Sequence, residues 1–392
     1  MVYDIVILGG GASGMVAAVK LAEKGFNVGL LEQKPRIGQK ILLTGNGRCN
    51  LTNLKISPCN YHSDNLGIVD EVITKFGSAE VLNFFSSIGL LTREKDGLVY
   101  PMSNKASSVL DCLRNALSKY GVSIITDFSL KFADKQDDKF IIKSIDDDIT
   151  QAKKLIIATG SAAFQGTSKG LDILREFGHS IKELYPALVQ LRSEDAFLKG
   201  LKGVKFNGEI RVRQGNDLLR REKGEMLFTD YGISGIAVMQ VSYLFSLYDK
   251  LSLELDFLPH MNLSEVAEML KNNKKFYQGS SVTAEDYLTG ILDRKLGIRL
   301  LKHGGEKSLA RNLKALPIKI SGHNGFKSAQ VCGGGASLDD FCKETLESLH
   351  VKGLYAIGEV LDAVGDCGGY NLHWAWASAL YASEALGRVE DL

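Results

Sequence analysis

Along the first half of the chain, the pattern of apolar and polar positions predicts strands that alternate with helices. Short apolar runs at residues 4–9, 28–32 and 154–158 predict buried strands. Apolar residues at helical spacing predict helices over 14–24 and 107–119, the second followed by a strand at 123–125. Runs at 128–132 and 139–145 flank a polar turn and predict a β-hairpin. This alternation is typical of an α/β fold.

The pattern changes after about residue 187. Period-two runs at 189–191, 206–213 and 251–257 predict an antiparallel β unit. Residues 263–314 have a helical pattern instead, seen at 264–270 and 287–292. Asn262 and Glu265 have the spacing of a capping box at the start of this segment. Strand signals return at 318–320, 328–332 and 351–357, and a final helix is expected over 372–386.

Length and composition narrow the class of protein. The 392 residues are enough for two to three domains, and 45% hydrophobic with 24% charged residues is ordinary for a globular chain. A balance of 47 basic and 46 acidic residues gives no sign of a nucleic-acid or anionic-membrane partner. The chain leads straight into its first strand, so no signal peptide is expected, and no apolar run is long enough for a membrane span. Six cysteines without CxxC or zinc-ligand spacing predict reduced thiols in a cytoplasmic protein without a metal site.

The most specific motif lies at the first predicted strand. Gly9, Gly11 and Gly14 form GxGxxG between this strand and a helix, and Glu32 closes the next strand. This layout is the dinucleotide-binding fingerprint. Gly9 would make the tight turn, Gly11 would let a pyrophosphate approach, and Gly14 would let the helix pack on the strand. Glu32 would accept hydrogen bonds from the ribose hydroxyls of an adenosine.

Two later motifs fit the same ligand. Ala158-Thr159-Gly160 ends a strand, and Gly358-Glu359 ends another, with Gly368-Gly369-Tyr370-Asn371 opening the last helix. A carboxylate at 359 can bond a ribityl hydroxyl, and the helix N-terminus at 371–372 can face the N1–C2=O edge of a flavin. Taken in this order, the three motifs resemble those of the glutathione-reductase-like superfamily of FAD enzymes.

Further segments make the resemblance more specific. Residues 38–53, 228–235, 358–362 and 368–372 resemble a bacterial family of NAD(P)/FAD-dependent oxidoreductases, the "aminoacetone oxidase family", which includes BaiN-type proteins. The resemblance implies a Rossmann-like FAD-binding domain interrupted by a β-barrel-like domain that carries a helical insertion. The corresponding ranges are 1–186 with 333–392 for the FAD domain, 187–262 with 315–332 for the β-rich substrate or capping domain, and 263–314 for the insertion. The chain departs from the family at Cys332-Gly333-Gly334-Gly335-Ala336 and at residues 161–165.

The resemblance and the residue types together give the candidate cofactor site. Residues 38–53 form a Gly-rich polar loop that can wrap a phosphate or place polar groups near an isoalloxazine. The predicted FAD-binding residues are Gly9, Gly11, Ala12, Ser13, Gly14, Glu32, Gln33, Lys34, Lys40, Thr44, Gly45, Gly47, Arg48, Cys49, Asn50, Ala158, Thr159, Gly160, Gly358, Glu359, Gly369, Tyr370, Asn371 and Leu372.

Three residues are candidates for catalysis, each with a structural alternative. Arg48 can contact the pyrophosphate or a substrate carbonyl, or order its loop through a salt bridge. Tyr231 can donate a proton or pack, and His373 can act as acid or base or pack in the last helix. Cys49, in the cofactor set, is either a redox thiol beside the flavin or a small packed residue.

These features predict an FAD-dependent oxidoreductase that transfers hydride through flavin N5. On family analogy, the expected reaction is the reduction of an enone-type small molecule with NAD(P)H as the electron donor. The chain has no second complete nucleotide-binding unit, so NAD(P)H would bind only transiently. A flavin-dependent amine or ketone oxidase and a non-catalytic FAD-binding redox sensor are the alternatives. The balanced charge argues against an RNA-modifying flavoenzyme, so no nucleic acid and no membrane are expected as partners. The oligomeric state is left open.

Overall fold

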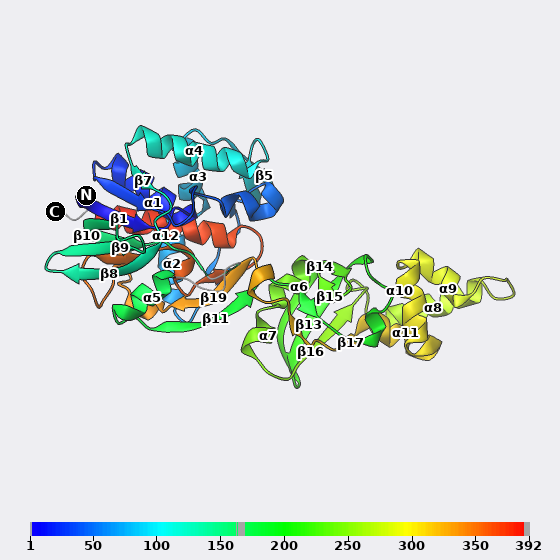
Figure 1. Ribbon diagram of the computed structural model, residues 1–392. Helices are drawn as coiled ribbons and strands as arrows, with labels where there is room; N and C mark the ends of the chain where they lie inside the picture. The colour runs from blue at the N-terminus through cyan, green and yellow to red at the C-terminus, as the bar shows by residue number, and fades with distance from the viewer. Residues whose placement is uncertain (1, 162, 164–168, 388–392) are drawn as a thin grey trace. The chain divides into compact units, whose positions relative to one another are not determined.

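The computed structural model describes residues 2–161, 163 and 169–387 and divides the chain into two compact units (Figure 1). Unit 1 comprises Met1–Leu184 and Val331–Leu392, and unit 2 comprises Tyr185–Gln330. The predicted boundaries of the FAD domain at 186 and 333 lie close to these limits. The helical segment belongs to unit 2, so a separate insertion domain stays a prediction.

Unit 1 is built on a seven-stranded sheet with the order β7-β2-β1-β10-β9-β8, in which β20 also pairs with β10. β1, β2, β7, β10 and β20 run parallel, and β9 pairs antiparallel with both the start of β10 and β8. The mixed α/β architecture with a Rossmann-like parallel sheet is therefore as predicted. The strands are β1 (Val2–Leu8), β2 (Val28–Leu31), β7 (Ser123–Ile125), β8 (Leu130–Gln136), β9 (Lys139–Ser144), β10 (Ile149–Ile157) and β20 (Leu354–Ala356).

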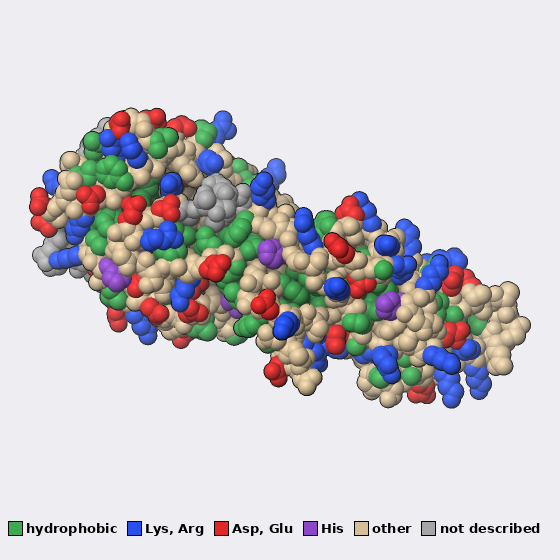
Figure 2. Space-filling view, turned by 60° about the horizontal axis from the view of Figure 1, so that its bottom comes forward, with side chains coloured by type: hydrophobic (Ala, Val, Ile, Leu, Met, Phe, Trp, Pro, Cys, Tyr) green, Lys and Arg blue, Asp and Glu red, His purple; other side chains and the backbone are tan. Residues whose placement is uncertain are grey.

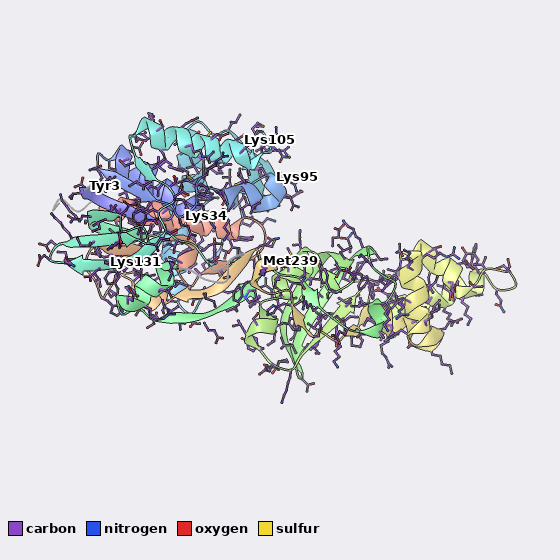
Figure 3. The ribbon with its side chains drawn as sticks, in the orientation of Figure 1. Tyr3, Lys34, Lys95, Lys105, Lys131 and Met239 are labelled. Atoms are coloured by element: carbon purple, nitrogen blue, oxygen red, sulfur yellow. The ribbon has the colours of Figure 1, made fainter. Side chains whose placement is uncertain are left out.

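The helices of unit 1 pack on this sheet or on one another (Figure 1). They are α1 (Ala12–Glu23), α2 (Leu66–Lys75), α3 (Ser78–Ser87), α4 (Ala106–Lys119), α5 (Lys169–Glu176) and α12 (Tyr370–Leu386). α1 packs on β1 and β2 and also against α4 and α12. Close packing needs small residues within the sheet as well, and the ring of Tyr3 (labelled in Figure 3) lies over Gly29, where an added Cβ would come within 3.0 Å of it. α12 is buried on nearly every face, as expected of a helix that is apolar all round.

Short strands complete unit 1. β3 (Thr52–Asn53), β6 (Leu98–Pro101) and β5 (Thr92–Lys95) form one small sheet, and β4 (Tyr61–His62) pairs with β21 (Val364–Gly365). β19 (Val331–Ala336) pairs with β11 (Ile181–Ala187). The described helices include none that is long and apolar enough to span a membrane.

Unit 2 contains a seven-stranded sheet with the order β17-β16-β13-β14-β15-β12-β18 and antiparallel pairing. Its strands are β12 (Leu191–Arg192), β13 (Lys205–Gln214), β14 (Asp217–Phe228), β15 (Gly232–Ser234), β16 (Leu251–Asp256), β17 (Leu316–Ile318) and β18 (Gly322–His323). Its helices are α6 (Ile236–Val241), α7 (Leu244–Leu247), α8 (Leu263–Phe276), α9 (Ala284–Tyr287), α10 (Arg294–Lys302) and α11 (Gly305–Lys314). The antiparallel unit and the helical segment were both predicted.

The start of α8 confirms the predicted capping box. The amide of Glu265 donates to Asn262 Oδ1 over 3.0 Å, and the amide of Asn262 donates to Glu265 Oε2 over 2.6 Å. Two amides that have no partner within the helix are thereby satisfied.

A buried ion cluster joins the unit 2 sheet to α11. Asp256, 1% exposed, accepts hydrogen bonds from Arg211 Nη2 and Lys314 Nζ, each over 2.6 Å. Arg211 also donates through Nε to Glu209, which is equally buried. Because burial of a charge is costly unless it is paired, these ions stabilise unit 2 only as a set.

Several local predictions were wrong. The strand expected at 328–332 lies at Val331–Ala336, and the one expected at 189–191 is replaced by β11 and β12 on either side. β14, α2 and α3 were not predicted at all. Glycines at 333–335 shifted the expected end of β19, because a glycine run normally indicates a turn.

Candidate functional site

The three sequence motifs meet at one edge of the unit 1 sheet. β1, β10 and β20 are parallel neighbours, with Leu8 opposite Ile157 and Ile157 opposite Ala356. Because parallel strands end at the same edge, the turns that follow them lie side by side. Gly160 shows this directly, since a Cβ added to it would lie 3.9 Å from Glu359 Oε2. Ligands of open α/β sheets bind at this edge.

The fingerprint glycines have distinct surroundings. Gly9 has φ +110°, and an added Cβ would lie 2.4 Å from the carbonyl oxygen of Ala158. At Gly14 an added Cβ would lie 1.9 Å from the carbonyl oxygen of Gly9. Only glycine fits these two positions. At Gly11, by contrast, no described atom lies within 4 Å of an added Cβ, so this turn leaves open space for a ligand beside the backbone.

The open space adjoins the N-terminus of α1. Gly11 is the N-cap and supplies no side-chain cap, and the first turn carries no acidic residue. Ala12 and Ser13 contribute backbone amides at this end. Unsatisfied amides and the helix dipole favour an anion such as a pyrophosphate here.

Glu32 is tied to the same turn. Its Oε2 accepts the amide of Gly10 over 2.8 Å, and its Oε1 accepts the amide of Lys34 over 2.9 Å. Lys34, labelled in Figure 3, and Gln33 are exposed beside it. Each carboxylate oxygen has a further lone pair, so Glu32 can hold the turn and still accept ribose hydroxyls.

Lys40 and Glu359, 319 positions apart in the chain, form an ion pair. Lys40 Nζ lies 2.6 Å from Glu359 Oε2, with 39% and 18% of the side chains exposed. Ser161 Oγ donates to the same oxygen over 3.4 Å. The loop after β2, the turn after β10 and the turn after β20 therefore each bring a polar group to one point. Of the altered stretch 161–165, Ala162, Phe164 and Gln165 lie outside the described residues.

The predicted polar loop turns sharply. It contains the short 3₁₀ segment Ile41–Gly47, with Gly45 and Asn46 in the left-handed region. Arg48 is exposed, donates from Nε to the carbonyl of Gly45 over 3.4 Å, and has its guanidinium 5.7 Å from the centroid of the Tyr100 ring. These contacts order the loop, and Arg48 forms no salt bridge with a described residue.

The two residues after Arg48, Cys49 and Asn50, turn from the exposed loop into the protein interior. Cys49 is fully buried, and burial raises the pKa of its thiol to about 12. A thiol that stays protonated is a poor redox nucleophile, which favours the packing alternative. Asn50 Oδ1 is buried with no hydrogen-bond partner among the described residues.

The N-terminus of α12 lies next to Asn50. Gly369, the N-cap, has φ +94°, and a Cβ there would lie 2.8 Å from the backbone of Thr52 and 3.1 Å from Asn50 Nδ2. Asn371 fixes the approach to the helix, because its side chain bonds both the amide and the carbonyl of Gly365, over 2.8 and 2.7 Å. Tyr370 and Leu372 are partly or largely buried beside it. The open space at Gly11 and the unpaired Asn50 oxygen both fit FAD bound along this edge.

His373 lies in the core of unit 1, where a catalytic acid or base could not reach a substrate. It is fully buried, its Nδ1 lies 2.8 Å from Thr52 Oγ1, and burial lowers its pKa to about 4. An imidazole without access to a substrate cannot exchange a proton with it, so the structure favours the helix-packing alternative. Tyr231 lies in unit 2, in the turn between β14 and β15, with 37% of its surface exposed. Its role as proton donor stays a prediction.

Two buried side chains of α12 were not predicted to serve the site. Ser378 Oγ accepts the amide of Gly358 over 2.9 Å, and Trp374 Nε1 donates to the carbonyl of Gly358 over 3.1 Å. Both backbone groups of the glycine before Glu359 are thus held by one helix. The four-residue spacing of Trp374 and Ser378 places them on one face, but the sequence alone does not show what that face touches.

Asp366 and the glycine run at 333–335 have structural roles. Asp366 Oδ1 lies 3.0 Å from His62 Nε2, and Gly334 and Gly335 have positive φ with their Cα atoms against the backbones of Glu183 and Val360. The glycine run at 333–335 therefore serves strand packing in β19 and forms no second nucleotide loop.

A Rossmann-like sheet with three converging turns, a match to a Rossmann-domain family and similarity to a reductase over nearly the whole chain together give the class of this protein: it is an FAD-dependent oxidoreductase. The chain belongs to the family described as the HI0933-like protein Rossmann domain, whose sequence model matches residues 3–385.

The chain is similar to two relatives over nearly its whole length and to one solved structure in its fold. The chain is 37% identical to the 3-dehydro-bile acid delta(4,6)-reductase of Clostridium scindens, over 97% of this chain and 98% of the relative. It is 29% identical to the ribosomal RNA dihydrouridine synthase of Haemophilus influenzae, over 98% of each chain. The 3-ketosteroid-delta4-(5alpha)-dehydrogenase of Rhodococcus jostii RHA1 shares the fold, with a TM-score of 0.54, 15% identity, and coverage of 98% of this chain and 96% of that one.

Proposed function

We propose that this protein reduces a carbon–carbon double bond conjugated with a carbonyl group in a small organic substrate, with NAD(P)H as the electron donor. The observation that carries the proposal is the 37% identity, over nearly the whole chain, to a reductase whose name specifies a 3-dehydro-bile acid and delta(4,6) double bonds. The 3-oxo group and the double bonds of such a substrate form a conjugated dienone.

Two further relatives support reduction of the same type of bond. They are the ribosomal RNA dihydrouridine synthases of Haemophilus influenzae and Escherichia coli, which are 29% and 27% identical to this chain. In uracil the C5=C6 bond is conjugated with the C4 carbonyl, and its reduction gives dihydrouridine. Relatives that differ greatly in substrate size thus share one reacting group. Uridine in RNA is therefore the second candidate substrate.

The residues of unit 1 account for cofactor binding. The Gly9–Gly14 turn and the start of α1 would hold the pyrophosphate, Glu32 the adenosine ribose, and Lys40 with Glu359 the ribityl chain. The start of α12, at Gly369–Leu372, would place a partial positive charge at the N1–C2=O edge. A bound flavin supplies hydride transfer at N5.

The chain must also supply a proton and binding for the donor. Reduction of a conjugated double bond places a proton on the carbon next to the carbonyl, and the Tyr231 hydroxyl is the candidate donor. Because the glycine run at 333–335 is taken up by β19, the nicotinamide would bind transiently at the substrate face.

Anaerobic half-reactions test the proposal. The flavin of the purified protein should bleach with NADH or NADPH and reoxidise with an enone, but not with the matching saturated ketone. Rapid reoxidation by oxygen alone would favour the oxidase alternative, and no reduction by either nucleotide would favour the redox sensor. Tyr231→Phe should slow reoxidation by the enone and leave reduction by NAD(P)H unchanged.

A further inference from the structure

Charge is unevenly divided between the two units. Unit 2, residues 185–330, contains 22 Lys and Arg against 16 Asp and Glu, a formal net charge of +6. The remaining residues contain 25 basic and 30 acidic side chains, a net charge of −5. The balance of the whole chain therefore conceals a basic unit, and such an asymmetry indicates a polyanionic partner.

Much of this excess lies in the helical segment. Residues 263–314 hold ten basic and six acidic side chains. Lys and Arg side chains are spread over the visible face of unit 2 in Figure 2. On α10, Lys295, Arg299 and Lys302 are spaced by four and three residues, which places them on one face of the helix.

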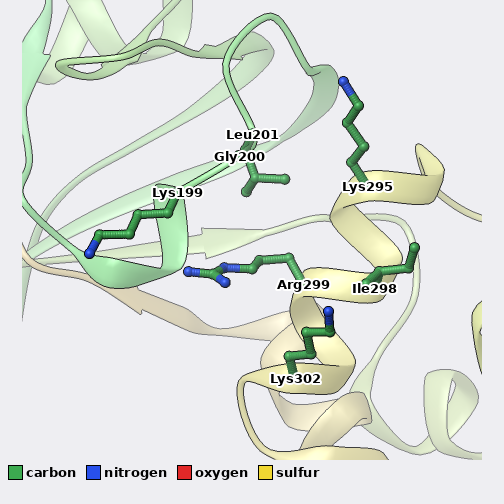
Figure 4. Close-up of a pocket in the computed structure, with 7 residues that line it drawn as sticks. All are labelled: Lys199, Gly200, Leu201, Lys295, Ile298, Arg299 and Lys302. Carbon is green, nitrogen blue, oxygen red and sulfur yellow. The ribbon is translucent and has the colours of Figure 1, made fainter.

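That face borders a pocket of about 200 Å³ within unit 2 (Figure 4). The pocket lies between α10 and the loop after Phe197, and its lining residues are Lys199, Gly200, Leu201, Lys295, Ile298, Arg299 and Lys302. Four of these seven are cations, and none is acidic.

Arg299 is held in place by hydrogen bonds, and none of the four cations is neutralised by a described residue. Arg299 donates from Nε to the carbonyl of Phe197 over 2.8 Å, and its Nη2 donates to the carbonyl of Ala196. Carbonyl dipoles fix the guanidinium without cancelling its charge. Lys199, Lys295 and Lys302 are exposed, and none of them forms an ion pair with a described residue.

The spacing of the four cations around the pocket suits a chain of phosphates better than a single small anion. In Figure 4 the Lys295 side chain extends away from Arg299, and Lys199 reaches out from the opposite side of the pocket. A small anion would need donors that converge on one point. Flexible lysines spread along a rim suit a chain of phosphates instead, because each can contact a different one.

We propose that the basic face formed by Lys199, Lys295, Arg299 and Lys302 binds the phosphate backbone of RNA. The choice of RNA rests on the second candidate substrate of the proposed function, whereas the site itself rests on the charges of unit 2. The face would position an RNA by backbone contacts and would not read its bases.

Equilibrium binding to a fluorescent RNA hairpin with uridines in its loop tests the proposal, with the FAD-loaded full chain. The affinity should fall steeply with salt. The double variant Lys295→Glu/Lys302→Glu should bind at least roughly tenfold more weakly at low salt and should lower the log–log salt slope by about two, one for each lost phosphate contact. Lys295→Gln/Lys302→Gln should show a smaller loss in the same direction, and it replaces the first variant if charge reversal disturbs folding.

The control is Lys95→Glu/Lys139→Glu, which changes the net charge equally at two exposed lysines of unit 1 (Lys95 is labelled in Figure 3). It should bind RNA like the unchanged protein. Equal losses in both double variants would overturn the proposed site, because they would reflect net charge alone. The proposed site would also be overturned if the Lys295→Glu/Lys302→Glu variant bound RNA like the unchanged protein but had a raised KM for NADPH and an unchanged KM for NADH. That result would assign the face to the 2′-phosphate of the electron donor. Enone reduction is measured separately, so failure of RNA binding does not decide the proposed reaction.

Discussion

Single residues at the sheet edge combine a structural and a binding task. Glu32 holds the amides of Gly10 and Lys34, and thereby shapes the turn that leaves space beside Gly11. Lys40 and Glu359 pair with each other where a ribityl chain would run. Substitution of such residues therefore affects both the shape of the site and its contacts, and matched variants are needed to separate the two.

Glu32→Ala should weaken FAD binding by roughly 1–3 kcal/mol, because the ribose loses a charged acceptor and the Gly10 amide loses its partner. Glu32→Gln keeps one oxygen acceptor and should lose less. Titration of the apoprotein with FAD measures both. Equal affinities in all three proteins would mean that Glu32 does not face the ribose.

Cys49 should be chemically silent in the folded protein. Burial raises the pKa of its thiol to about 12, so almost no thiolate exists at about pH 8. Cys59 is exposed and should react with a thiol reagent at that pH. Mass spectrometry of the alkylated native protein should find Cys59 modified and Cys49 unmodified. Labelling of Cys49 before unfolding would restore the redox alternative.

At the scale of elements, α12 organises the site from within the core. Its N-terminus is fixed by Asn371, and its next turns hold Gly358 through Trp374 and Ser378 and the carbonyl of Leu51 through Trp376. A buried helix with hydroxyl and indole groups can satisfy turns that surface loops would leave to water.

Ser378→Ala should destabilise the protein by about 1–3 kcal/mol, because the buried Gly358 amide loses its acceptor. FAD affinity should fall with it, since Glu359 follows this glycine. Ser383→Ala is the matched control: Ser383 is equally buried in α12, but its hydroxyl has no partner among the described residues, so its loss should be nearly neutral. Urea denaturation and FAD titration measure the two effects. Identical behaviour of the two alanine variants would remove Ser378 from the site.

His373 should make stability depend on pH on the acid side. Its pKa is lowered from 6.5 to about 4 by burial, so the unfolded chain binds a proton that the folded chain does not between these values. Stability is therefore retained above pH 6.5 and lost as the pH falls toward 4, by about 2 kcal/mol between about pH 7 and about pH 5. His373→Gln should flatten this part of the curve in urea denaturation. A slope that the variant leaves unchanged would assign it to other groups.

Elements differ in how far the sequence could predict them. The β1–α1–β2 unit and the capping box at Asn262 depend on contacts near in sequence, and both were predicted. β14 was missed because its middle, Arg220 to Lys223, is a run of charges without an apolar face. It is a strand because β13 and β15 flank it and pairs such as Lys205 with Glu225 satisfy its charges across the sheet. The role of Ser378 was missed because its partner, the amide of Gly358, lies 20 residues away in the sequence, so the contact depends on the fold.

At the scale of the molecule, the units divide the work and the charge. Unit 1 contains every residue that the three FAD motifs contribute, and unit 2 carries the basic excess and its own buried ion cluster. Averaging over 392 residues hides this division, so the net charge of +1 does not test whether unit 2 has a polyanionic partner, and the expectation that the protein binds no nucleic acid stays a prediction. Each unit also has its own hydrophobic core.

Separate cores predict two unfolding transitions in calorimetry, each sensitive to a different change. FAD at about 100 times its Kd should stabilise unit 1 by about 2.7 kcal/mol and raise only the transition of that unit. Asp256→Asn leaves Arg211 and Lys314 without their shared carboxylate and should destabilise unit 2 by about 3–5 kcal/mol. Asp217→Asn, an exposed carboxylate in β14, is the control and should change neither transition. If FAD and Asp256→Asn instead shift one common transition, the units unfold cooperatively, and binding at the FAD edge stabilises the basic unit as well.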